Sequence, residues 1–199
     1  MKKLKVLLDN GHGKETAGKR SPVWGDIPQI FEWEYTRMIT AELEKRLKCL
    51  GFTVHLITPE TEDIPLHIRT KRVKEWEKQY GKENCITVSV HLNAANTPLA
   101  KGWEAHTYLG YSTSDKYSKI FYDKAEKYFD IIRKGGVSND DPDWDSNFAI
   151  LRDVAGPAVL TENLFMTNRE DCEILLSDEG KEKIINLHID ALYEIDKLL

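Results

Sequence analysis

The chain has 199 residues, of which 41% are hydrophobic and 31% are charged, a composition typical of one compact globular domain. It excludes a disordered or fibrous protein, and no apolar run approaches the roughly 20 residues that a membrane-spanning helix requires. The net charge of −5 is uneven, with 16 basic and 13 acidic residues up to position 100 and 12 basic and 20 acidic residues after it. Because no basic face is indicated, we do not expect nucleic-acid binding.

Short apolar runs alternate with amphipathic stretches, which is the pattern of an α/β domain. The predicted strands cover residues 4–9, 53–58, 85–91, 103–108, 148–151 and 157–162. The predicted helices cover residues 33–49, 64–80, 114–131 and 177–198. We therefore predict a single domain over residues 1–199, with a mostly parallel, twisted central sheet of about six strands and helices on both faces.

Capping residues support these helix ends. Gly51 and Gly81 follow the first two helices as C-terminal stops. Ser177 or Asp178 is expected to cap the last helix, and Asn168 to cap a further helix that begins near Arg169.

The first strand runs into a glycine-flanked turn that presents a histidine, in the order Asp9, Asn10, Gly11, His12, Gly13. Such glycines serve either to cradle a phosphate or to free the backbone so that His12 faces a metal. The phosphate interpretation lacks a Gly-Lys-Ser/Thr or a complete Gly-x-Gly-x-x-Gly pattern. The irregular stretch 10–31 that follows is long for a compact domain, and such loops are often functional.

Two further strands end in residues that can bind a metal. His91 closes the run 86–91, and Glu162 closes the run 158–162. The carboxyl ends of parallel strands are where α/β enzymes keep their chemistry, so the convergence of His12, His91 and Glu162 suggests a metal site. Each histidine taken alone is equally well explained as a structural residue.

Other polar groups have simpler interpretations. Cys49, Cys85 and Cys172 are odd in number and far apart, so we expect buried free thiols. The acidic stretch from Asp140 to Asp145 could bind calcium, but it lacks the glycine and terminal glutamate of an EF-hand. We expect a solvated loop there.

Several motifs in this order resemble the zinc-dependent N-acetylmuramoyl-L-alanine amidases of the amidase-3 type. The resemblance runs from about residue 4 to about residue 195 and rests on the following segments: Asp9-x-Gly-His-Gly13, Glu32-x-Glu34 before a helix, Ser89-x-His-x-Asn-Ala94, Gly102-x-Glu104, and residues 157–168 around Glu162. It implies that His12, Glu32 and His91 bind Zn²⁺ and that Glu162 is the catalytic carboxylate.

That division of roles agrees with zinc chemistry. Three protein ligands leave a fourth tetrahedral position for water, as a catalytic zinc requires, and Glu162 could then exchange protons with the attacking water and the leaving amine. Glu32 is preferred to Glu34 because Glu34 should point elsewhere once the helix has begun. Glu15, in the loop before this helix, is the remaining candidate.

Substrate contacts are assigned to three residues. Asn93 follows His91 and could orient a ligand or the peptide, and Asn163 follows Glu162. Arg152 could meet the carboxylates of an acidic stem peptide.

The resemblance implies a peptidoglycan hydrolase that cleaves the amide between N-acetylmuramic acid and L-alanine of the stem peptide. The alternatives are a zinc peptidase or deacetylase acting on another amide, and an inactive wall-binding module. Peptidoglycan is the expected partner, with no membrane insertion and a monomeric state. No signal peptide is seen, so we expect an endolysin-like enzyme made in the cytoplasm and released or exported to the cell wall, or a mature or truncated secreted domain.

Overall fold

One six-stranded sheet organises the computed structural model, which describes residues 3–136, 138 and 140–199. Its spatial order is β2-β1-β3-β6-β4-β5. The strands are β1 (Lys5–Asn10), β2 (Thr53–Leu56), β3 (Cys85–Asn93), β4 (Glu104–Thr107), β5 (Trp144–Asp145) and β6 (Ala158–Phe165). Strands β2, β1, β3 and β6 are parallel to one another, whereas β4 is antiparallel to β6. The prediction of a mostly parallel sheet is confirmed.

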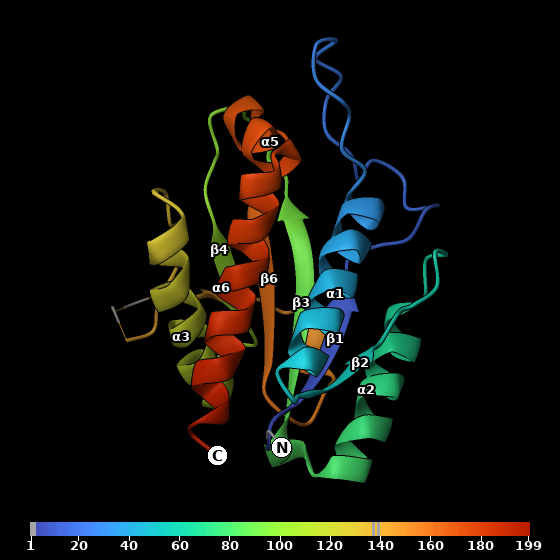
Figure 1. Cartoon of the computed structure of the whole chain (residues 1–199), viewed down its shortest axis with the longest axis vertical. Helices are drawn as coiled ribbons and strands as arrows, with labels where there is room; N and C mark the ends of the chain where they lie inside the picture. Colours follow the sequence, from blue (N-terminus) through green and yellow to red (C-terminus); the bar gives the residue numbers. More distant parts are fainter. Residues whose placement is uncertain (1–2, 137, 139) are drawn as a thin grey trace.

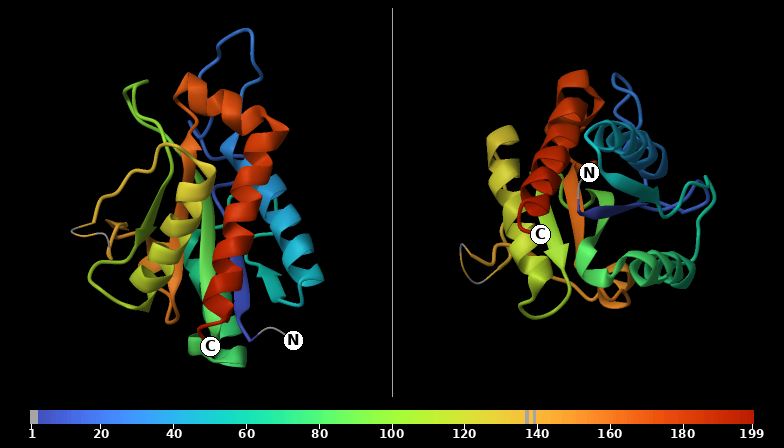
Figure 2. Two further views of the ribbon diagram at one scale, coloured as in Figure 1. Left: turned by 60° about the vertical axis from the view of Figure 1, so that its left-hand side comes forward. Right: turned by 60° about the horizontal axis from the view of Figure 1, so that its bottom comes forward.

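Helices cover both faces of this sheet, also as predicted (Figures 1 and 2). They are α1 (Glu32–Cys49), α2 (Leu66–Tyr80), α3 (Thr113–Tyr128), α4 (Ala149–Arg152), α5 (Arg169–Leu176) and α6 (Asp178–Asp196), with a 3-10 turn η1 (Lys82–Asn84). The helices α1, α3 and α6 lie on one face, and α2 and α4 lie on the other. Within the described residues, no helix is long and apolar enough to cross a membrane.

The core is split into two clusters by the sheet. Val6 and Leu8 of β1 face the larger cluster beneath α1, α3 and α6, whereas Leu7 faces the smaller one beneath α2 and α4. All three side chains are fully buried. This explains why the strand reads as an unbroken apolar run rather than an alternating one, since both of its faces are covered by helices.

The predicted strand at 148–151 is wrong. Residues Ala149–Arg152 form the short helix α4, in which the amides of Leu151 and Arg152 donate to the carbonyl of Phe148. Ile150 and Leu151 pack into the smaller core cluster. A run of four apolar residues carries no periodicity that separates strand from helix, and the sixth strand is instead the two-residue β5.

Most helix ends agree with the capping residues. Gly51 follows the C-cap residue of α1 and has a φ angle of 88°. Gly81 is itself the C-cap of α2 and has a φ angle of 84°. Asn168 and Ser177 accept backbone hydrogen bonds as the N-caps of α5 and α6. The third helix is shorter than predicted and ends at Tyr128, because Phe129 is already extended.

The cysteine prediction is correct for two of three residues. Cys85 and Cys172 are buried free thiols. Cys49 is exposed because it is the last residue of α1 and falls on the solvent side of that helix.

Candidate metal centre

The candidate centre lies where the connections of the sheet diverge. From β1 the chain crosses to β2 on one side and then to β3 on the other side of β1. The carboxyl ends of β1 and β3 therefore border a topological switch point, which is the usual ligand position of open α/β sheets. His12 follows β1 and His91 lies near the end of β3.

His12 is held in a left-handed backbone conformation with a φ angle of 61°. For a residue with a Cβ atom this conformation is strained and persists only when its surroundings enforce it. The His12 carbonyl accepts hydrogen bonds from Arg37 Nη1 at 3.0 Å and Arg69 Nη2 at 3.3 Å. These two guanidinium groups fix the turn that presents the imidazole.

Glu32, the first residue of α1, is fully buried between the two imidazoles. Its Oε1 is 3.0 Å from His91 Nδ1 and accepts the amide of Leu92 at 3.1 Å, whereas its Oε2 is 3.4 Å from His12 Nε2. Burial alone would raise the pKa of Glu32, but the neighbouring imidazoles outweigh it and hold the pKa well below its usual range. Glu32 therefore remains a carboxylate, the form that binds a metal.

His91 completes the cluster from β3. Its ring lies edge-on to that of His12, with 5.1 Å between the ring centroids. Burial lowers the pKa of His91, but the adjacent Glu32 carboxylate reverses this effect and the net shift is upward. The negative charge of Glu32 thus stabilises positive charge in the space between the rings.

The donor set fits a zinc ion. One possible ligand atom from each of His12, Glu32 and His91 lies within 4.8 Å of the others. Glu32 Oε2 is buried and lacks a hydrogen-bond partner, as expected of an atom whose partner is a bound cation. Two imidazoles and one carboxylate form a known three-ligand set of catalytic zinc.

Glu162 stands beside this cluster, paired with His91 in the register of β3 and β6. Burial raises the pKa of Glu162 to about 8, with the negative charges of Glu32 and Glu104 adding to the shift and His91 opposing it. Glu162 Oε2 is buried without a hydrogen-bond partner. The buried carboxyl group thus holds a proton more readily than an exposed glutamate does.

The cluster opens into a cavity of about 790 Å³. Its wall includes His12, His91 and Glu162 together with residues from the loop after β2 and from α4. Arg152 and Lys19 place positive charge on the wall, and the half-exposed ring of Phe148 adds an apolar surface. Sequence reasoning did not identify Lys19, which belongs to the irregular 10–31 segment.

The structure separates the three predicted substrate residues. Arg152 lines the cavity. Asn93 does not line it and donates to Glu104 Oε1 at 2.6 Å. Asn163 is fully buried and donates to the His91 carbonyl at 3.1 Å while accepting from Trp103 Nε1. Asn163 therefore has no group that faces the cavity. Its contacts indicate a structural role, in which it supports the backbone of His91.

A buried ion pair supports the cluster from below. Arg69 Nη1 is 3.0 Å from Asp9 Oδ1, and both side chains are at most 3% exposed. Ser89 donates to the other oxygen of Asp9 at 2.6 Å. Arg69 also donates to the carbonyls of Asn10 and His12. Sequence reasoning missed Arg37, because nothing in its local sequence connects it to His12.

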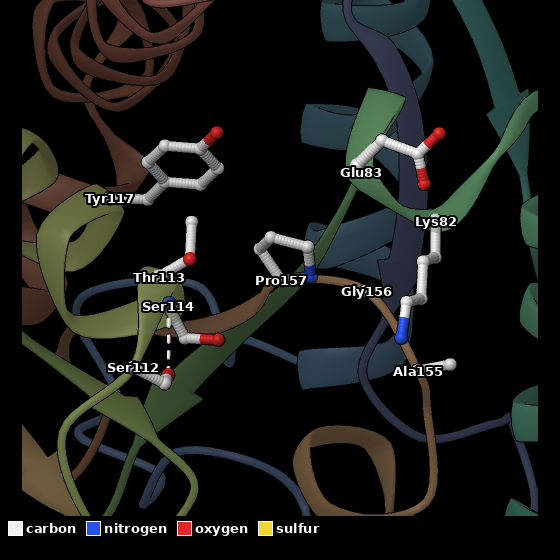
Figure 3. A pocket seen from close by; sticks show the side chains of 9 residues that line it. All are labelled: Lys82, Glu83, Ser112, Thr113, Ser114, Tyr117, Ala155, Gly156 and Pro157. Atoms are coloured by element: carbon white, nitrogen blue, oxygen red, sulfur yellow. Dashed lines mark hydrogen bonds between the residues drawn. The ribbon is translucent and has the colours of Figure 1, made fainter.

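A second hollow lies at the opposite end of the sheet, between η1, the start of α3 and the segment before β6 (Figure 3). Its lining includes Lys82, Glu83 and three hydroxyl residues at the start of α3. It contains no histidine and only one carboxylate among its described residues. This hollow therefore lacks the pair of histidines that lines the first cavity.

Comparison with known proteins places this arrangement in a family. Residues 6–194 match the family model Amidase_3, described as N-acetylmuramoyl-L-alanine amidase. The chain is 34% identical to the endolysin of Bacillus phage SPP1, covering 98% of this chain and 66% of the relative. It is 27% identical to the N-acetylmuramoyl-L-alanine amidase CwlM of Bacillus licheniformis, covering 95% and 67%. The chain thus spans about two thirds of the length of these relatives.

The fold is shared with solved structures. The N-acetylmuramoyl-L-alanine amidase from Clostridium difficile 630 superposes with a TM-score of 0.79 at 19% identity, covering 96% of this chain and 95% of that one. The catalytic domain of the amidase CwlV from Bacillus (Paenibacillus) polymyxa gives a TM-score of 0.75 at 20% identity. These similarities confirm the predicted α/β fold.

Proposed function

Because the chain belongs to the N-acetylmuramoyl-L-alanine amidase family Amidase_3, we propose that it hydrolyses peptidoglycan at the amide between N-acetylmuramic acid and the L-alanine of the stem peptide. The observation that carries this proposal is that His12, His91 and Glu162 line one cavity, with the Glu32 carboxylate buried between the two imidazoles. Both sides of the scissile bond, a lactyl group and a peptide, are bulky. An open cavity of about 790 Å³ suits such a substrate.

We assign His12, Glu32 and His91 as the residues that hold Zn²⁺. A bound zinc ion would supply a Lewis acid that lowers the pKa of a water molecule to about 7 and polarises the amide carbonyl. The unpartnered Glu32 Oε2 and the two imidazoles support this assignment.

Glu162 is assigned as the general acid and base. It takes a proton from the attacking water and returns it to the amine of L-alanine as that amine leaves. Its burial supports this role because a carboxyl group whose pKa is about 8 both accepts and donates a proton near neutral pH. His91 is paired with Glu162 in the strand register, so this carboxyl group lies beside the residues that would hold the metal.

Substrate binding is assigned to the cavity wall beside α4. The side chain of Arg152 is 39% exposed there and can donate to a carboxylate of the stem peptide. It already contacts Asp153 and Asn147, which orient the guanidinium group. Asn93 acts less directly in this assignment, by holding Glu104 near the metal cluster.

We further propose that residues 1–199 form the catalytic domain, that they act on the cell wall as a monomer, and that the wall is reached by release or export. The phage relative is named an endolysin, and the bacillar relative is named an amidase. Both are longer than this chain, so the role of the whole protein is part of the proposal.

Digestion of purified peptidoglycan tests the activity. Zinc-loaded protein is expected to release stem peptides that begin with L-alanine and to leave glycan with intact lactyl groups, as identified by mass spectrometry. Chelator-treated protein and Glu162→Gln should release neither, although Glu162→Gln should still bind zinc. Cuts within the peptide or loss of acetyl groups would instead identify a peptidase or deacetylase. Binding to the wall without any cleavage would identify an inactive module.

A further inference from the structure

Three carboxylates converge at a second place in the fold, on the far side of β4 from the zinc cluster. Asp115 belongs to the first turn of α3, and Asp141 and Asp143 belong to the loop before β5. One oxygen atom from each lies within 4.8 Å of the others. Asp115 and Asp143 are only 1% and 2% exposed. The expectation of a solvated acidic loop is therefore wrong for Asp143.

Asp143 lacks enough hydrogen-bond donors, whereas Asp115 Oδ2 already accepts from the amide and the hydroxyl of Ser112. The Thr107 hydroxyl lies 3.0 Å from Asp115 Oδ1 and 2.7 Å from Asp143 Oδ2. A hydroxyl group has one proton, so it can donate to only one of the two oxygens. Asp143 Oδ1 is buried and has no hydrogen-bond partner at all. An unsatisfied buried carboxylate oxygen is costly unless a cation meets it.

The cluster also lacks compensating positive charge. Among the described residues, no lysine, arginine or histidine forms an ion pair with Asp115, Asp141 or Asp143. Burial raises the pKa of Asp143 to about 6, and the charges of Asp115 and Asp141 add to this shift. Burial and neighbouring carboxylates raise the pKa of Asp141 as well. A bound cation would reverse both effects.

The loop is shaped to bring these residues together. The amides of Gly135 and Gly136 both donate to the Pro142 carbonyl, which folds the loop back on itself. A Cβ atom on Gly136 would collide with the carbonyl oxygen of Asp141. Glycine at this position therefore allows Asp141 to approach within reach of Asp115.

We propose that Asp115, Asp141 and Asp143 form a second metal site, which binds a hard divalent cation and prefers Ca²⁺. All the available ligands are oxygen atoms, including the Thr107 hydroxyl, and such sets favour calcium or magnesium over zinc. Calcium accepts the irregular geometry of a loop, whereas Mg²⁺ requires a nearly ideal octahedron. Asp141 is half-buried and provides the path from solvent.

Occupation of this site would stiffen one wall of the catalytic cavity. Asp143 is followed by β5, which pairs with His106 and Thr107 of β4. The chain then continues directly to Asn147 and Phe148, which line the cavity. The cation would fix the start of this segment to α3 and β4.

The test uses the whole chain loaded with zinc, so that the histidine cluster is already occupied. Calcium should raise the melting temperature of the wild type more than magnesium does at the same concentration. Terbium(III), which replaces calcium at oxygen sites, should become luminescent on excitation of tryptophan, because Trp144 directly follows Asp143. Asp143→Asn should weaken cation binding about tenfold or more, since even residues that only support a metal ligand have effects of this size.

Asp140→Asn is the matched control, because it removes the same charge from an exposed position of the same loop. It should respond to calcium as the wild type does. If Asp143→Asn fails to fold, Asp141→Asn makes the same test at a half-buried position. In calcium-free buffer at neutral pH, Asp143→Asn should melt at or above the wild-type temperature, because a repelling charge is gone.

Two results would overturn the proposal. The first is that neither calcium nor terbium(III) changes the melting temperature or the luminescence of the wild type. This would mean that Asp143 is protonated and binds no cation. The other is an equal calcium response in the wild type and in Asp143→Asn. Neither result affects the zinc-dependent cleavage proposed above, since that activity is measured separately on peptidoglycan.

Discussion

Gly11 lies against the imidazole ring of His91. A Cβ atom at Gly11 would stand 2.5 Å from His91 Nδ1 and 2.6 Å from His91 Cε1. The Gly11 amide meanwhile donates to the Val90 carbonyl at 3.0 Å and extends the pairing of β1 with β3. The first glycine of the turn therefore serves the histidine of a different strand, in addition to leading the chain to His12.

Gly11→Ala is expected to displace the His91 ring and to weaken zinc binding, because a contact of 2.5 Å is shorter than real Cβ contacts. The free energy of unfolding should fall as well, by about 1–3 kcal/mol, the usual cost of overpacking. Zinc content after dialysis and a urea unfolding curve measure the two effects. Gly18→Ala is the control for zinc content alone: nothing lies within 4 Å of a Cβ there, although its φ of 76° means that alanine also costs some stability. Normal zinc content in Gly11→Ala would contradict this reasoning.

Glu32→Gln should lose most of the bound zinc, whereas Glu34→Gln should retain it. Glu32 is fully buried between the imidazoles, and Glu34 is exposed on the other side of the same helix turn. The substitution keeps the shape of the side chain and removes only its charge. The zinc content of the two purified variants measures this difference. If Glu34→Gln loses more zinc than Glu32→Gln, the carboxylate ligand is assigned to the wrong position.

Arg69→Met should lower the free energy of unfolding by about 3–5 kcal/mol, because it leaves Asp9 as an unpaired buried charge. The bidentate pair of Arg72 with Glu60 is the comparison, since its side chains are 31% and 34% exposed. Arg72→Met should cost about 1 kcal/mol or less, as is typical of exposed pairs. Denaturant unfolding of both variants measures the difference. Similar losses would mean that burial does not dominate the Arg69 contact.

Stability should fall with acidification because of His188. Burial lowers the pKa of His188 to about 4. Its Nδ1 donates to the Ile184 carbonyl, which leaves Nε2 to accept from the Thr161 hydroxyl. Below about pH 6.5 this histidine is protonated in the unfolded chain but remains neutral in the folded chain. The free energy of unfolding is therefore highest above this pH and falls as the pH decreases to about 4. The contribution is at most about 3 kcal/mol.

Thermal unfolding of His188→Gln between pH 7 and pH 4 measures this contribution. The variant should be less stable at pH 7, because it loses the packing and hydrogen bonds of the buried ring, but its stability should change less with pH. His67→Gln, at an exposed histidine, should follow the wild-type curve. If the melting temperature of His188→Gln depends on pH as strongly as that of the wild type, other groups cause the acid sensitivity.

The order of the elements could be predicted from the sequence because it depends on local patterns. The apolar runs of β1, β3 and β6 are long enough to be recognised as buried strands, and their predicted ends identify His12, His91 and Glu162, although β6 continues past Glu162 to Phe165. The short segment around α4 could not be predicted, since four residues carry no periodicity. In the same way, the two-residue β5 exists only because β4 lies beside it.

The sequence by itself determined the fold class and placed His12, His91 and Glu162 on strands or just after them, because alternation, glycines and caps act over a few neighbouring residues. Only the tertiary structure placed Glu32 between two imidazoles, Asn163 beneath His91 instead of in the cavity, and Asp115 beside Asp143. Burial and charge at these positions are set by residues distant in the chain. Their ionisation and their partners therefore follow from packing, which no local pattern encodes.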